Sequence, residues 1–312
     1  GAISKANLTA EQDEIILGSA FFYLAVSGAN EDNNATGDLD VTSDMIFTGQ
    51  GMVATFINGS DLDRVFHVRN GATVKFRNLA VWNGRTELKG AGIYQVGGSL
   101  TIENCMILGN DAWGVTSFGG GIHCTGALTI SDSQIRDNNA GDPGNMTSGG
   151  TGGGVYVVGN SFTVTRCFIA NNKARAGGGL HAREANGEIS YSTFIGNTVY
   201  EHGGGVYVED TTSSIRNSTF RDNDGGWSGG GLFQGQFLSN NSDATILNST
   251  FSNNIARAGG GLDVHNGSMD LSFVTVTENK ADHADVWLIG NGGGLYKNSS
   301  PTAVVRIKNS II

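Results

Sequence analysis

The sequence predicts an all-β protein, a single-stranded, right-handed parallel β-helix (a solenoid) of roughly eleven coils. The first observation is a glycine triplet followed by an apolar residue, which recurs at Gly177-Gly178-Gly179-Leu180, Gly203-Gly204-Gly205-Val206 and Gly229-Gly230-Gly231-Leu232. The second is that each of these triplets is followed by the same series of isoleucine, serine, phenylalanine and asparagine. A unit of about 25 to 33 residues that recurs along a chain indicates stacked supersecondary units.

Composition is the third observation. Glycine accounts for 49 of the 312 residues and proline for only 2. Glycine at fixed places between apolar runs suits tight turns that join short strands, whereas collagen and disordered tracts need periodic or abundant proline. We therefore expect one β-helix domain over residues 1–312, with less regular coils over 1–90 and regular repeats over 90–312.

The N-terminal part contains short apolar segments separated by glycine and asparagine turns, as strands of the first coils would be. These expected strands are Glu14–Leu17, Phe21–Val26, Leu39–Val41, Met45–Phe47, Thr55–Ile57 and Val65–Val68.

From residue 90 onward the repeats align into columns with constant internal spacing. Side chains that stack directly above one another must keep register, so constant spacing marks the stacked part of each coil. The apolar column is Ile107, Ile135, Ile169, Phe194, Phe220, Phe251 and Val276. The asparagine column is Asn110, Asn138, Asn172, Asn197, Asn223, Asn254 and Asn279. We expect the apolar column to fill the core and the asparagine amides to hydrogen-bond from coil to coil at a bend.

The repeats resemble the passenger regions of polymorphic outer-membrane proteins and related bacterial autotransporters. The resemblance is carried by paired motifs such as Gly203-Gly204-Gly205-Val206 and Phe220-Arg221-Asp222-Asn223. The segments 28–32, 36–41 and 62–68 are similar to bacterial secreted β-helix proteins that carry the CSLREA domain, although that signature itself is absent. The resemblance implies an extracellular or cell-surface bacterial protein of adhesive function.

Charge excludes one class of partner. The formal net charge is −10, whereas a protein that binds DNA or RNA needs a basic stripe. The longest apolar run, Ala20–Val26, is too short for a transmembrane helix. The chain starts without a visible signal peptide, which is compatible with removal of a targeting segment.

The three cysteines, Cys105, Cys124 and Cys167, are expected to be free thiols in the core. Cys105 and Cys167 share a column but are two coils apart, about 10 Å at the spacing of parallel strands, which is beyond disulfide reach. Because they have no CxxC or Cys/His partner, no metal site is expected there.

The residue two positions after each glycine turn is predicted to point outward, because side chains alternate along a strand. This outward column reads Tyr94, His123, Tyr156, His181, Tyr207, Phe233, Asp263 and Tyr296. We expect it to form an exposed aromatic and charged face. Its candidate ligand-binding residues are Tyr156, Arg175, His181, Tyr207, Trp227 and Phe233.

Three interpretations of that face remain open. In the first it binds carbohydrate or another cell-surface component, because exposed rings stack on flat apolar surfaces. In the second it is the groove of a polysaccharide lyase or glycoside hydrolase, with an arginine that neutralises a uronate and with acid–base residues. The catalytic candidates in that case are His181, Arg183, Tyr207, Glu209, Asp263 and His265. In the third the charged and aromatic residues only pair between strands.

No cofactor is expected, apart from calcium as a weak alternative. Carboxylates are calcium ligands, and the N-terminal coils contain several of them, but their spacing matches neither the EF-hand loop nor the GGxGxDxUx repeat. These residues are Asp38, Asp40, Asp44, Asp61 and Asp63.

Overall fold

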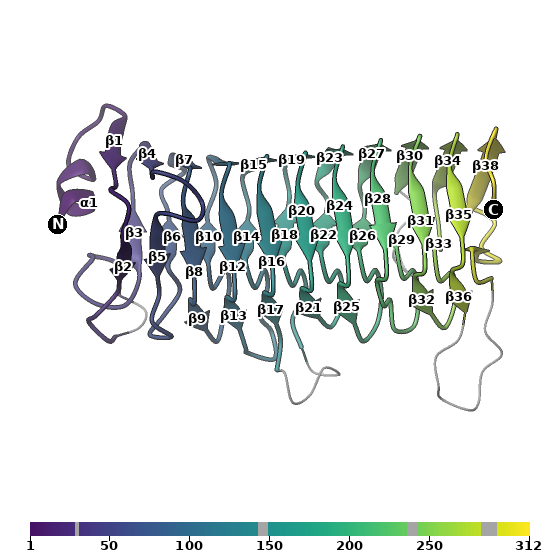
Figure 1. Cartoon of the computed structure of the whole chain (residues 1–312), viewed down its shortest axis with the longest axis horizontal. Helices are drawn as coiled ribbons and strands as arrows, with labels where there is room; N and C mark the ends of the chain where they lie inside the picture. The colour runs from purple at the N-terminus through teal and green to yellow at the C-terminus, as the bar shows by residue number, and fades with distance from the viewer. Residues whose placement is uncertain (29–30, 143–148, 236–241, 282–291) are drawn as a thin grey trace.

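The computed structural model describes residues 1–28, 31–142, 149–235, 242–281 and 292–312. Short parallel strands follow one another around coils that stack along the long axis, from the N-terminus at the left of Figure 1 to the C-terminus at the right. Among the described residues the strands form three long sheets, of 11, 10 and 10 strands, and two short ones. This confirms the predicted parallel β-helix and agrees with the expected number of coils.

The first sheet contains β1 (Asp13–Ile16), β4 (Met45–Thr48), β7 (Thr73–Arg77), β11 (Ser99–Glu103), β15 (Ala127–Ser131), β19 (Ser161–Thr165), β23 (Asn186–Ser190), β27 (Thr212–Arg216), β30 (Asp243–Leu247), β34 (Ser268–Ser272) and β38 (Val304–Lys308). The second sheet, whose strands follow the glycine turns, contains β3 (Leu39–Val41), β6 (Phe66–Val68), β10 (Ile93–Gln95), β14 (Ile122–Cys124), β18 (Val155–Val158), β22 (Leu180–Arg183), β26 (Val206–Glu209), β29 (Leu232–Gln234), β33 (Leu262–Val264) and β37 (Leu295–Lys297).

The third sheet contains β2 (Phe21–Tyr23), β5 (Phe56–Asn58), β8 (Ala80–Trp82), β12 (Met106–Leu108), β16 (Gln134–Arg136), β20 (Phe168–Ala170), β24 (Thr193–Ile195), β28 (Thr219–Arg221), β31 (Thr250–Ser252) and β35 (Thr275–Thr277). Two short sheets continue the coils beyond the asparagine bend: β9 (Arg85–Thr86), β13 (Asp111–Ala112), β17 (Asn139–Ala140), β21 (Lys173–Ala174) and β25 (Thr198–Val199), and then β32 (Ile255–Ala256) with β36 (Lys280–Ala281). The strands expected in residues 1–90 are all present. The short helix α1 (Ala2–Ala6) was not predicted, because five residues are too few to show a helical period.

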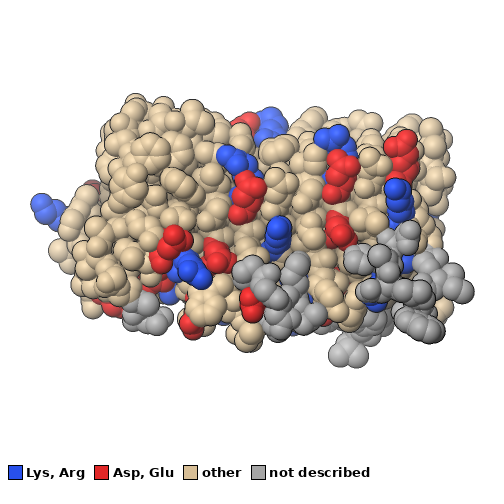
Figure 2. Space-filling model, turned by 60° about the horizontal axis from the view of Figure 1, so that its bottom comes forward, with Lys and Arg blue, Asp and Glu red and all other residues tan. Residues whose placement is uncertain are grey.

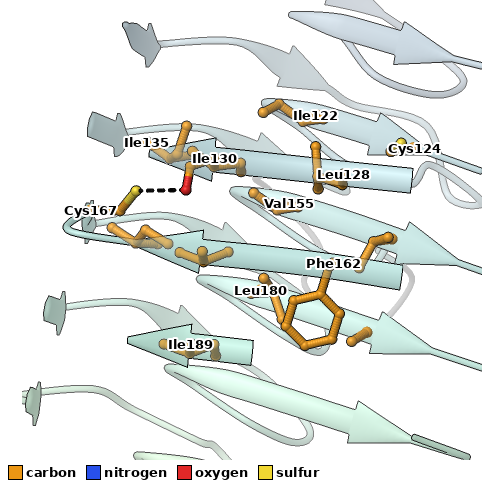
Figure 3. Close-up of a cluster of buried hydrophobic side chains, with 14 of the residues drawn as sticks. Ile122, Cys124, Leu128, Ile130, Ile135, Val155, Phe162, Cys167, Leu180 and Ile189 are labelled. Carbon is orange, nitrogen blue, oxygen red and sulfur yellow. Dashed lines mark hydrogen bonds between the residues drawn. The ribbon is translucent and has the colours of Figure 1, made fainter. Parts of the chain in front are cut away.

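The core is built from the predicted columns. Phe194, Phe220 and Phe251 are register partners in the third sheet. The rings of Phe194 and Phe220 lie 5.0 Å apart and those of Phe220 and Phe251 lie 4.5 Å apart, and both pairs are nearly parallel. Figure 3 shows the equivalent aliphatic part of the core, where Ile130 of β15, Ile135 of β16 and Ile189 of β23 belong to one buried cluster.

The cysteines are buried free thiols, as predicted. Burial raises the pKa of the Cys105 thiol to about 12 and that of Cys167 to about 11. Their backbone N–H groups donate to the serine hydroxyls one coil further on, from Cys105 to Ser133 at 3.0 Å and from Cys167 to Ser192 at 3.1 Å. The thiols therefore belong to a structural row and are poor nucleophiles at neutral pH.

The glycine turns need glycine for two separate reasons. Gly203 adopts a φ of +70°, which side-chain-bearing residues rarely adopt. At Gly204 a Cβ atom would lie 2.5 Å from the carbonyl oxygen of Asp224, inside contact distance. The triplet therefore sets how closely one coil approaches the next.

The asparagine column forms the predicted ladder of side-chain amides. Asn223 Oδ1 accepts hydrogen bonds from the backbone N–H and the Nδ2 of Asn197, both at 3.0 Å. Its own Nδ2 donates to the carbonyl of Phe194 at 3.0 Å and to Oδ1 of Asn254 at 2.9 Å. The Asn223 side chain is completely buried, so these bonds are protected from competition by water.

Replacing Asn223 with alanine is expected to lower the free energy of unfolding by about 3 kcal/mol or more, because it removes four hydrogen bonds and leaves buried partners unsatisfied. Urea unfolding at equilibrium measures the change. Asn160→Ala is the matched control, since Asn160 is exposed and accepts only one local bond, from Ser161 N–H. Equal stability of the two variants would contradict a structural role for the ladder.

Candidate functional site

The residues predicted to form a functional face do align. Tyr156, His181, Tyr207 and Phe233 are successive register partners in the second sheet, and Asp263 follows them. The ring centroids of neighbouring residues lie 5.0 Å, 4.3 Å and 5.0 Å apart along this series. We refer to these five residues as the ring column.

The ring column is not exposed, and the predicted exposed face is therefore wrong. The exposed fractions are 5% for Tyr156, 4% for His181, 8% for Tyr207 and 0% for both Phe233 and Asp263. These side chains do point away from the main core, as alternation requires, but other parts of the protein cover them.

The cover is the segment that enters each glycine turn. His202, two residues before Gly204, stacks on Phe233 with ring centroids 4.5 Å apart. At Gly203 a Cβ atom would lie only 2.7 Å from the Cβ of Tyr207, so the turn backbone lies directly on that side chain. The glycine turns thus convert an outward column into a second, smaller hydrophobic layer, which includes Ala176, Tyr207 and Phe233.

One charged network lies inside this layer. His181 Nε2 lies 3.3 Å from Glu209 Oε2, and Arg183 Nε lies 3.5 Å from Glu209 Oε1. Burial lowers the pKa of His181 despite the carboxylate beside it. Burial alone would raise the pKa of Glu209, but its contacts with His181, Arg183 and Tyr207 lower it. The arrangement is a neutral imidazole and an ionised carboxylate that is balanced by Arg183.

The remaining catalytic candidates are also enclosed or paired. Burial raises the pKa of the Tyr207 hydroxyl well above its usual range. Asp263 is completely buried and lies 3.5 Å from His265 Nε2. Burial lowers the pKa of His265. A substrate therefore has no direct access to the carboxylate of Asp263 or the imidazole of His181.

Trp227 and Arg175 are accessible, but they lie on the neighbouring edge of the coil. Trp227 is 39% exposed and packs on Tyr200, with ring centroids 5.5 Å apart. Arg175 Nη1 forms an ion pair with Glu201 Oε1 at 3.0 Å. The structure thus separates these two residues from the four predicted binding residues that are buried.

Two of the five carboxylates considered for calcium, those of Asp38 and Asp63, face one guanidinium. Asp38 Oδ2 lies 2.6 Å from Arg64 Nε, and Asp63 Oδ1 lies 3.8 Å from the same atom. The guanidinium supplies the positive charge that an ion would bring. Within the described part of the chain, only Asp40 of these five belongs to a group of potential metal ligands.

Exposed rings occur instead on the third sheet, near the N-terminus, where the sequence predicted no site. Phe21 and Phe56 stack with centroids 4.5 Å apart and an angle of 8° between the rings. Trp82 lies 6.4 Å from each of them. Phe21 is 52% exposed and Tyr23, next to it, is 62% exposed. We call these four residues the aromatic ladder.

A polar depression lies just past the asparagine bend from Trp82. Its volume is about 490 Å³, and Asp61, Arg85, Glu87 and Trp113 contribute to its lining. We call these four residues the polar hollow. The guanidinium of Arg85 lies 5.8 Å from the centre of the Trp113 ring. Figure 2 brings this edge of the coils forward and shows acidic and basic side chains close together on it.

The aromatic ladder and the polar hollow are connected through the chain and by a side-chain contact. Trp82 ends β8 and Arg85 begins β9, with Asn83 and Gly84 between them. Asn83 Nδ2 donates to Asp61 Oδ2 at 3.3 Å. Arg85 Nε lies 3.7 Å from Asp111 Oδ2, a carboxyl whose pKa is raised by burial. A flat apolar surface and a set of hydrogen-bonding groups therefore adjoin each other.

A third feature is an apolar cavity of about 290 Å³ at the N-terminal end of the core. Ile3 of helix α1, Leu17, Phe22 and Leu39 are among its lining residues. Because it is almost entirely apolar, it offers few groups that would orient a ligand.

Replacing Asp263 with asparagine is expected to make stability less dependent on pH. Burial raises the pKa of Asp263 from 3.8 to about 8, so the folded protein holds a proton that the unfolded chain releases near pH 4. The free energy of unfolding therefore falls as the pH rises through this interval, and the loss is complete above the folded-state pKa.

Thermal unfolding midpoints of both proteins between about pH 5 and pH 9 test this. As the pH rises, the unfolding midpoint of the variant should increase relative to that of the wild type. The same pH dependence in both proteins would mean that Asp263 is not protonated in the folded state.

A solved structure similar to this chain is the A-module of a mannuronan C-5 epimerase from Azotobacter vinelandii, with a TM-score of 0.49 and 14% identity over 100% of this chain and 89% of that chain. No curated protein matches the chain. In the described ranges, no helix has the length and apolar character needed to cross a membrane.

The family described as the right-handed β-helix region matches residues 144–280 and 190–311. Together these matches span more than half of the 312 residues. They agree with the parallel strand order and the in-register columns described above. The chain belongs to the right-handed β-helix family.

Proposed function

We propose that this protein binds carbohydrate at its N-terminal coils, through the aromatic ladder and the polar hollow together. The observation that carries the proposal is their adjacency: rings on β2, β5 and β8, of which Phe21 and Tyr23 are exposed, continue around one bend into a depression with carboxylates, a guanidinium and a tryptophan. Sugar rings present both an apolar C–H face and a rim of hydroxyl groups. The two parts of the site match these two chemistries.

The aromatic ladder supplies the apolar contact. The Phe21 and Phe56 rings are nearly parallel, and Trp82 is inclined by 72° to Phe56. Fixed rings at the spacing of strands lose little conformational entropy when a ligand stacks on them. A chain of sugar residues can therefore lie along the ladder in an extended form.

The polar hollow supplies hydrogen bonds to the ligand, and its charge determines which sugars it prefers. Asp61 and Glu87 are carboxylates, and Asp111 lies beside the single guanidinium of Arg85. Carboxylates accept hydrogen bonds from hydroxyl and ammonium groups. Since acidic groups outnumber basic ones here, the site favours neutral sugars or amino sugars over uronate polymers.

We further propose that the protein acts outside the cell or at the cell surface, in an adhesive role. This rests on the resemblance of the glycine triplets and the asparagine-ended motifs to autotransporter passenger regions. The burial of His181, Tyr207 and Asp263 removes the main support for a lyase or hydrolase on the ring column. Binding without turnover is therefore the favoured function.

Trp82→Ala and Trp113→Ala are each expected to weaken oligosaccharide binding by about tenfold, which corresponds to roughly 1.4 kcal/mol per lost ring contact. A glycan array identifies the ligand, and calorimetric titration measures the affinities. Phe168→Ala is the matched control, because Phe168 lies on the same sheet and is 42% exposed, but its position is further along the stack.

The proposal fails if no glycan binds, or if the two tryptophan variants bind as tightly as Phe168→Ala. Appearance of ultraviolet absorbance from an unsaturated product, on incubation with a uronate polymer, would instead establish a lyase. The folded state of each variant is checked by its thermal midpoint.

A further inference from the structure

A second group of polar residues lies where the second sheet begins, separate from the proposed carbohydrate site. Asp40 on β3 and His67 on β6 are register partners on neighbouring coils. Asp32, from the segment that leads into β3, places its Oδ1 atom 3.8 Å from His67 Nδ1. This group stands at the N-terminal end of the sheet that carries the ring column.

Asn34 holds the backbone of Asp40 and one of its carboxylate oxygens, but the other carboxylate oxygen has no hydrogen-bond donor. Asn34 Nδ2 donates to the Asp40 carbonyl, and Asp40 N–H donates to Asn34 Oδ1, both at 2.8 Å. Asp40 Oδ2 accepts from the Asn34 backbone N–H at 3.3 Å. Asp40 Oδ1 accepts none, although the residue is completely buried. A buried carboxylate oxygen is normally satisfied by a donor or a cation.

The distances suit two ligands of one cation better than a hydrogen bond. Asp40 Oδ1 lies 3.5 Å from His67 Nδ1, which is longer than a normal N–H···O bond. Zinc bonds of about 2.0 to 2.1 Å in tetrahedral geometry place neighbouring ligand atoms about 3.3 Å apart. The ligand atoms of all three residues lie within 4.8 Å of one another.

We propose that Asp32, Asp40 and His67 bind a divalent transition-metal cation, and that zinc is the cation preferred. The imidazole ligand favours a transition metal, because calcium and magnesium prefer oxygen ligands alone. The His67 ring is already oriented, since it stacks on Tyr94 with centroids 5.0 Å apart and 5° between the planes. Asp32 is 53% exposed, so solvent can complete the coordination.

The guanidinium of Arg69 competes with a metal ion for the carboxylates of Asp32 and Asp40. Its Nη1 lies 2.5 Å from Asp32 Oδ1 and 3.9 Å from Asp40 Oδ1. Because this side chain is 29% exposed, it can turn toward solvent when a cation enters. The site thus holds either the guanidinium or the metal, and removal of the guanidinium charge should tighten metal binding.

A bound metal would tie the segment before β3 to the stacked coils. Asp32 belongs to that segment, whereas Asp40 and His67 belong to the second sheet. The ion would therefore stabilise the first coils.

In the experiment, zinc chloride is titrated into the full chain after treatment with EDTA. The heat of binding is measured by calorimetry, and the thermal unfolding midpoint is measured with and without zinc. We expect one zinc ion per chain and a higher midpoint with zinc. Asp32→Asn and His67→Gln should each weaken binding at least tenfold, whereas Arg69→Gln should strengthen it. His265→Gln controls for adventitious binding by other histidines and should leave the affinity unchanged.

Asp32→Asn is the safest variant for folding, because its side chain is largely exposed, and its midpoint in EDTA should equal that of the wild type. Absence of zinc binding would overturn the proposal, as would equal affinities of the wild type and His67→Gln. Tighter binding of calcium than of zinc would overturn the choice of a transition metal.

Discussion

The ladder of buried asparagines is the constraint on which the rest of the structure depends. Inside the ladder, an Oδ1 accepts two N–H groups from the preceding asparagine and an Nδ2 donates to the following one, as at Asn138, Asn172 and Asn197. An offset of one residue would break several of these buried bonds at once, so every coil that carries a ladder asparagine must bend at the same place. With the bend fixed, the isoleucine, phenylalanine and serine–cysteine columns are placed in register as a consequence, because the distances between them along each coil are constant.

The same register explains why the ring column is a structural layer. Strand alternation turns His181 and Tyr207 away from the core, and glycine allows the turn backbone to descend onto them. Histidines in this layer stay neutral, since burial lowers the pKa of His202 to about 3. The groups proposed to bind a ligand therefore lie in the N-terminal coils, where the repeat is least regular. At the N-terminal coils, the rings of Phe21 and Tyr23 stay exposed on β2, and the carboxylates of Asp61 and Glu87 line an open depression.

The sequence predicts the columns, the strands and the free thiols, because constant spacing and two-residue alternation are direct consequences of stacking. Strand alternation predicts which way a side chain points, but it does not predict which other segment covers that side chain. The prediction of exposure was therefore wrong for Tyr156, His181, Tyr207 and Phe233. Phe21, Phe56 and Trp82 were missed because they come from residues 1–90, where irregular loop lengths hide the register. The pairing of Phe21 with Phe56 would have emerged from aligning those first coils by their apolar pattern. Asp32 lies outside any strand, so no periodicity could have brought it to His67.

Amide hydrogen exchange across the whole chain tests the central claim most directly. The backbone N–H groups of Asn110, Asn138, Asn172, Asn197 and Asn223 each donate to the next asparagine of the ladder and are buried. If the ladder fixes the register, these amides should exchange among the slowest in the protein and lose protection together on global unfolding. Exchange of these amides as fast as that of exposed turn residues, while the neighbouring strands stay protected, would contradict the account.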